Sequence, residues 1–72
     1  MSRYAIVIET TDTGYSAYAP DLPGCVAVAD TREDIEREMA DAIEFHLEGH
    51  RAEGLPIPPA TTSTACVEAA AA

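Results

Sequence analysis

A six-residue stretch, Pro-Asp-Leu-Pro-Gly-Cys at residues 20–25, constrains this chain more than any other part of it. Each proline fixes φ near −65°, whereas the glycine after the second proline can adopt a positive φ. Residues 15–19 and 25–29, on either side, have the composition of short β-strands. The stretch therefore predicts a rigid, sharply turned corner between two neighbouring strands.

The first strand of this sheet is predicted at residues 3–9, which include five consecutive apolar residues. An uninterrupted apolar run is typical of a strand that is covered on both faces. Residues 10–14 are polar and end in glycine, which predicts a hairpin loop. The three strands are therefore expected to form an antiparallel meander.

A long amphipathic helix is predicted to begin after Thr31, whose hydroxyl can cap the helix N-terminus. Asp34 then stands where a capping box usually has glutamate. One stripe of the helix collects residues at spacings of three and four, namely Ile35, Met39, Ala42, Ile43, His46 and His50. We place the end of the helix at Gly54, which precedes Leu-Pro; the alternative is Gly49, where the helix could also bend.

Residues 61–67 are rich in β-branched side chains and predict a final strand, parallel to the first after a right-handed crossover. The fold class is thus α+β, in the order β-β-β-α-β, with one long helix on one face of the sheet. We expect a single domain over residues 1–68 and a frayed tail at 69–72. The other face of the sheet would be bare, and a second copy of the chain is its simplest cover.

Length and composition point to the class of partner. A chain of 72 residues buries only about 60% of its unfolded surface, so self-association is an expected source of stability. Two cysteines are too few for a disulfide scaffold, and without a signal peptide or membrane-spanning run a cytoplasmic location is expected. The net charge of −9 argues against direct binding of nucleic acid and suits a basic protein partner, although a merely solvated surface explains it equally well.

Three residue patterns could carry chemistry, and each has a plainer interpretation. His46 and His50 could share a metal ion, but leucine stands where the zincin motif needs glutamate, which favours a histidine at the core edge or an interface. Cys25 lies away from any helix N-terminus that would lower its pKa, which favours a structural thiol. Eight acidic residues between positions 33 and 53 fit a solvated helix face better than a two-metal nuclease. We predict no catalytic residue, cofactor or metal.

Several pieces of the sequence together resemble the HicB family of antitoxins. They are residues 18–25 with the corner, Asp-Thr at 30–31, Asp-Ala-Ile-Glu at 41–44 and Glu-Gly-Leu-Pro-Ile-Pro at 53–58. The resemblance implies a degenerate, partial ribonuclease H-like fold without the nuclease acids. It also implies a partner, the small basic HicA toxin, which cleaves mRNA and which family antitoxins bind and block.

From this resemblance we expect a non-enzymatic antitoxin that forms a dimer or tetramer, neutralises a HicA-like toxin and binds neither nucleic acid nor membranes directly. The predicted toxin contacts are Asp21 and Leu22 at the corner, with a purely structural turn as the alternative, and Glu44 and Glu48 on the helix. Many family members continue into a ribbon-helix-helix or helix-turn-helix domain, and this sequence is interpreted as a short form without one. Two alternatives stay open: an orphan oligomeric binding module, and a metal-dependent nuclease.

Overall fold

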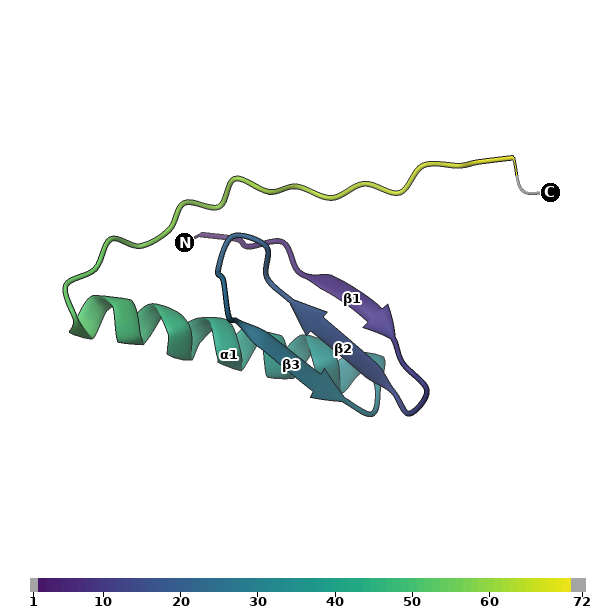
Figure 1. The fold of residues 1–72 in the computed structure, drawn as a ribbon, viewed down its shortest axis with the longest axis horizontal. Helices are drawn as coiled ribbons and strands as arrows, with labels where there is room; N and C mark the ends of the chain where they lie inside the picture. Colours follow the sequence, from purple (N-terminus) through teal and green to yellow (C-terminus); the bar gives the residue numbers. More distant parts are fainter. Residues whose placement is uncertain (1, 71–72) are drawn as a thin grey trace.

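The computed structural model describes residues 2–70 and contains three strands followed by one helix (Figure 1). The strands are β1 (Val7–Thr10), β2 (Tyr15–Tyr18) and β3 (Val26–Ala29), and the helix is α1 (Arg32–Ala52). The sheet is antiparallel in the order β1-β2-β3. The predicted α+β class, with a meander and one helix, is confirmed, although β1 begins at Val7 and not at residue 3 as predicted.

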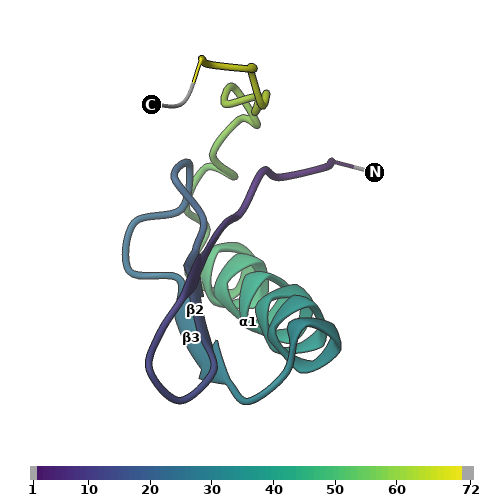
Figure 2. The same ribbon diagram turned by 90° about the vertical axis from the view of Figure 1, so that its right-hand side faces the viewer.

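The strand register divides the sheet into a covered face and an open face. Ile8, Ala17 and Ala27 are aligned across the three strands, and α1 packs over this face against β2 and β3 (Figure 2). Because side chains alternate between the two faces of a strand, Val26 and Val28 point the other way and are 65% and 76% exposed. The expected bare face of the sheet is therefore present.

The core is small and takes side chains from the sheet, the corner and the helix. Three large side chains, those of Leu22, Ile35 and Met39, are fully buried. Ile35 and Met39 belong to the predicted apolar stripe of α1, whereas Leu22 comes from the corner. Burial of these three side chains therefore fixes the helix, the sheet and the corner relative to one another.

The C-terminal end of α1 resolves the choice between Gly49 and Gly54. Gly54 has a φ of +70°. Its N–H donates to the carbonyl of Arg51, and the N–H of Leu55 donates to the carbonyl of His50. These two bonds form a Schellman motif, so the helix ends before Gly54 as predicted, and Gly49 lies inside it.

The N-terminal end of α1 is also as predicted. The hydroxyl oxygen of Thr31 accepts a hydrogen bond of 3.1 Å from the backbone N–H of Asp34. This bond satisfies one of the first N–H groups of the helix, which have no partner within the helix itself.

The predicted fourth strand is wrong. Residues 55–70 form an extended segment that pairs with none of the three strands, and Figure 1 shows it standing off from β1. The β-branched composition predicted extended backbone correctly, but a strand also needs a neighbour at hydrogen-bonding distance. Of the predicted frayed tail, residues 69–70 have no secondary structure and residues 71–72 lie outside the described residues.

Candidate partner-binding site

The corner between β2 and β3 is closed by its own backbone. The N–H of Ala19 donates to the carbonyl of Cys25, and the N–H of Cys25 donates to that of Leu22, at 3.1 and 3.0 Å. The N–H of Leu22 returns to the carbonyl of Ala19 at 3.1 Å. Gly24 has a φ of +86°, a conformation that strains any residue with a side chain. The predicted rigid corner is thus formed by three hydrogen bonds and one glycine.

Leu22 supports this corner from inside. Its side chain is 0% exposed and belongs to the core. The side chain is therefore not exposed in this structure, and the prediction that Leu22 contacts the toxin stays a prediction. Leu22 attaches the corner to the helix and the sheet.

Asp21 binds within its own chain. Its Oδ2 accepts hydrogen bonds from the backbone N–H groups of Thr61 and Thr62, both at 2.9 Å. Its Oδ1 accepts from the hydroxyls of the same two residues, at 3.1 and 2.7 Å. These bonds, those from Thr62 foremost, lower the pKa of Asp21 because they stabilise the charged carboxylate. Asp21 therefore ties the extended segment to the corner, and the predicted partner contact at Asp21 stays a prediction.

Glu44 and Glu48 lie on the exposed side of α1. Glu48 accepts a hydrogen bond of 3.1 Å from Arg51, and the other two arginines of the helix pair in the same way with acidic residues one turn away. Such exposed pairs contribute little to stability. They do occupy the helix arginines, which leaves the carboxylates of Glu38, Asp41 and Glu44 without an ion pair in residues 2–70.

Phe45 lies among these carboxylates and was not among the predicted site residues. Its side chain is 82% exposed at the middle of α1. Asp41, Phe45 and Glu48 are spaced by four and three residues, so they share one side of the helix. Glu38 and Glu44 flank this row. We call these five residues the acidic helix face.

The sequence did contain a signal for Phe45. On a helix with 3.6 residues per turn, position 45 falls about 100° to one side of the stripe that Ile35 and Met39 define, outside the face that enters the core. A single exposed apolar residue is ordinary on a protein surface. An exposed aromatic ring beside three carboxylates that have no arginine partner in residues 2–70 is less ordinary, and it combines an apolar anchor with negative charge.

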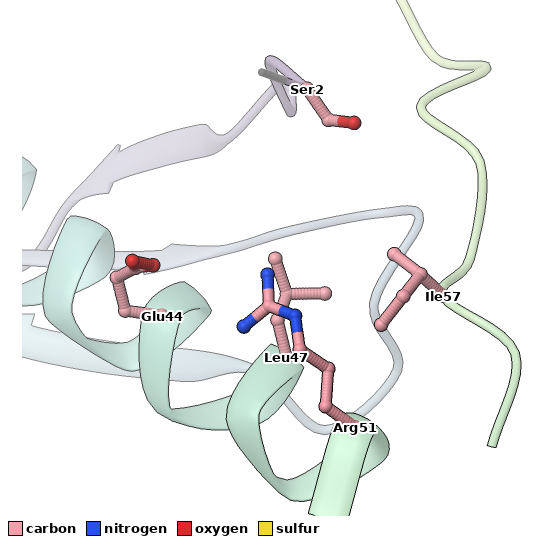
Figure 3. A pocket seen from close by; sticks show the side chains of 5 residues that line it. All are labelled: Ser2, Glu44, Leu47, Arg51 and Ile57. Atoms are coloured by element: carbon pink, nitrogen blue, oxygen red, sulfur yellow. The ribbon is translucent and has the colours of Figure 1, made fainter. Parts of the chain in front are cut away.

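A hollow of about 180 Å³ lies beside the acidic helix face (Figure 3). Glu44, Leu47 and Arg51 line it from α1, Ser2 from the start of the chain and Ile57 from the extended segment. The lining contains one carboxylate and neither histidine nor cysteine. It therefore offers no paired carboxylates of the kind that two-metal hydrolases use.

The two histidines contact each other on the half-buried side of α1. Their ring centroids are 4.7 Å apart, and Nδ1 of His50 donates to the carbonyl oxygen of His46 at 3.0 Å. Nowhere in residues 2–70 do three or more His, Cys, Asp or Glu side chains gather so that they could hold a metal ion.

The two cysteines differ in their access to solvent. Cys25 is buried, and this burial raises the pKa of its thiol, which suits the structural role predicted for it. Cys66, on the extended segment, is exposed. In the part of the chain that the structure describes, the helix is too polar to cross a membrane.

The fold defines the class of protein, because it is similar to that of a solved structure described as a HicA3 and HicB3 toxin–antitoxin complex. The two chains superpose with a TM-score of 0.67 and 36% sequence identity over 76% of this chain and 64% of the other. The class is thus that of the toxin–antitoxin proteins. The chain belongs to the HicB-like antitoxin family of bacterial toxin–antitoxin systems, whose family model matches residues 4–71. The resemblance seen in the sequence is confirmed.

Several curated proteins are similar to parts of this chain. A 14.9 kDa protein from the rep–hol intergenic region of Haemophilus phage HP1 is 41% identical over 46 residues, which are 64% of this chain and 35% of the phage protein. A UPF0150 protein of Synechocystis is 38% identical over 57 residues, 78% of this chain and 72% of that protein. A UPF0150 protein of Archaeoglobus fulgidus is 38% identical over 47 residues, 64% and 68% of the two chains. The chain spans about a third of the phage relative and most of the other two.

Proposed function

We propose that this chain is a non-enzymatic, cytoplasmic antitoxin that binds and neutralises a small basic toxin of the HicA kind through the acidic helix face. Membership of the HicB-like family and the likeness to a toxin–antitoxin complex support the antitoxin role. The exposed ring of Phe45 among carboxylates carries the choice of surface. Buried aromatic anchors ringed by polar residues often dominate the affinity of protein interfaces.

The charge distribution explains how such a surface would inhibit a toxin that cleaves RNA. Seven acidic residues lie within the 21 residues of α1, so the negative potential of the chain is concentrated there. A protein that binds RNA presents cations to the phosphates. The carboxylates of the acidic helix face would steer that basic surface toward α1 and occupy it. Neutralisation then requires contact alone and no reaction at any residue of this chain.

Phe45→Ala tests the surface without disturbing the fold. Because the side chain is 82% exposed, we expect the free energy of unfolding in urea to change by no more than about 0.5 kcal/mol. We expect the dissociation constant for a HicA-like toxin to rise about 30-fold, as for an interface hot spot worth about 2 kcal/mol. Calorimetric titration measures this change, and unaltered affinity would move the site elsewhere on the molecule.

A matched pair of double variants separates local charge from net charge. Asp41→Asn with Glu44→Gln removes two carboxylates from the acidic helix face, and Glu9→Gln with Asp12→Asn removes two exposed ones from the β1–β2 hairpin. We expect only the first pair to slow association and to reduce its salt dependence strongly. Equal effects from both pairs would mean that net charge alone attracts the toxin. The lack of any complex at low salt would refute the antitoxin role.

We also propose that the chain self-associates as a dimer or tetramer. The open sheet face exposes Val26, Val28 and Tyr18, at 65%, 76% and 42%. The register places these three side chains on one face of the sheet. The same face would serve the second candidate function, an oligomeric module for a protein other than a toxin. Sedimentation equilibrium measures the assembly directly.

A further inference from the structure

We propose that the extended segment of one copy adds as a strand to the open edge of β1 in a second copy of this chain. The inference rests on the self-association proposed above and adds the β1 edge as an interface distinct from the open sheet face. It holds whether or not a toxin is bound. It depends on four properties of the chain: a strand that can be donated, an edge that can accept it, the charge of both, and the tie at Asp21.

The donor is residues 63–70. The carboxylate of Asp21 ties Thr61 and Thr62 to the corner with four hydrogen bonds. Beyond this tie the backbone stays extended without pairing to a strand, and Val67 is 88% exposed. Figures 1 and 2 both show this part of the segment away from the sheet. Thr64 and Val67 are the β-branched residues of this donor and favour a strand, but its own chain supplies no ladder in this structure.

The acceptor is the free edge of β1, which pairs only with β2. An edge strand presents a row of unpaired N–H and C=O groups, and proteins commonly guard such edges with lysine or proline. The sequence of β1, Val-Ile-Glu-Thr, contains neither, and its one charged residue is Glu9. Because α1 packs over β2 and β3, the side chains of Ile6 and Ile8 near this edge are only half-buried. An added strand would complete their burial.

Charge decides which surfaces of two copies can meet. With a net charge of −9, two copies repel each other wherever their acidic helices approach. Residues 54–70 carry a single charged side chain, Glu68, and β1 carries a single one, Glu9. Strand addition therefore joins two nearly neutral parts of the chain and leaves both acidic helix faces turned outward.

The tie at Asp21 favours a second copy over the segment's own chain. Thr61 and Thr62 are fixed at the corner, and the residues after them leave the body at that point instead of following β1 (Figure 1). The other free edge, that of β3, lies on the side of the sheet away from the segment (Figure 1). Strand addition usually places an extended peptide beside an exposed sheet edge. In a two-fold dimer each copy would do this to the other, so that each extended segment would pair with the partner's β1.

A spin label distinguishes pairing between copies from pairing within one copy. A nitroxide is attached to the exposed Cys66, while Cys25 is buried and stays unmodified. The labelled chain is mixed with a ¹⁵N chain that carries Cys66→Ser, and reduction of the nitroxide gives the reference spectrum. We expect broadening of the β1 amides (Val7–Thr10) in the ¹⁵N chain. A second sample carries the nitroxide and the ¹⁵N label in the same chain. Broadening of the β1 amides in this second sample alone, or in neither sample, would overturn the proposal.

Two neighbouring proline substitutions provide the second test. Alternate N–H groups of a strand point to the same neighbour, so one of Ser63→Pro and Thr64→Pro removes a ladder bond while the other serves as its matched control. We expect one variant to raise the dimer dissociation constant about tenfold or more and the other to change it far less. Unchanged assembly in both would refute strand addition and leave the open sheet face as the interface.

The outcomes also separate this inference from the antitoxin role. Toxin binding is measured on the same two proline variants, and we expect it to persist because the acidic helix face lies on another element. A monomer that binds toxin would refute self-association alone. A dimer that binds no toxin would refute the antitoxin role and leave strand addition standing.

Discussion

Replacing Leu22 by alanine tests whether the corner supports the fold or contacts a partner. The side chain is 0% exposed within a small core. Truncating a fully buried leucine to alanine costs about 2–5 kcal/mol, from lost burial and from the cavity left behind. A domain of 72 residues has about 4–11 kcal/mol of total stability at 0.05–0.15 kcal/mol per residue. Leu22→Ala is therefore expected to remove a large part of it.

Urea unfolding followed by circular dichroism measures this loss of stability. In thermal unfolding, the midpoint temperature should fall by about 8 °C or more. All variants are compared at one protein concentration, because self-association makes apparent stability depend on concentration. Leu22→Met is the control, since it conserves volume and should cost less than about 1.5 kcal/mol. Toxin affinity of Leu22→Ala should decline only as far as its folded fraction declines.

Two results would refute this reasoning. The first is a Leu22→Ala chain whose free energy of unfolding lies within about 0.5 kcal/mol of the parent, as for a surface substitution. The second is a Leu22→Met chain that is as stable as the parent yet loses toxin binding, because that would make Leu22 a contact residue.

Three further predictions concern other parts of the chain. Gly14→Ala should destabilise the fold, because a Cβ there would clash with a backbone carbonyl of β3. Gly49→Ala has open space around the new Cβ and should stabilise α1 by about 0.5–1 kcal/mol. If urea unfolding shows Gly14→Ala to be the more stable of the two variants, both assignments are contradicted. Because the pKa of Asp21 is lowered, its hydrogen bonds to the extended segment should be complete above the ordinary aspartate pKa and should be lost as the pH falls through the lowered value. Amide exchange in the extended segment measures this pH dependence, and Asp21→Asn should abolish it. A maleimide should modify Cys66 alone in the native chain and also Cys25 in urea, as intact mass will show; rapid native labelling of Cys25 would contradict its burial.

Local sequence determined most of the fold. The corner at residues 20–25, the cap at Thr31 and the end of α1 at Gly54 each depend on residues within about five positions of one another. Proline geometry, a side-chain cap and a glycine with positive φ act at that range whatever the rest of the chain does. The apolar stripe of α1 likewise specified which side of the helix enters the core.

Tertiary structure decided the parts of the site that join distant segments. Asp21 meets Thr61 forty residues further along the chain, and this contact holds against the corner a segment that was predicted to form a fourth strand. Leu22 is buried in one core cluster with Ile35 and Met39 of α1, and no local pattern specifies that packing. Composition and periodicity report what a residue prefers, whereas exposure and hydrogen-bond partners depend on which segments the folded chain brings together.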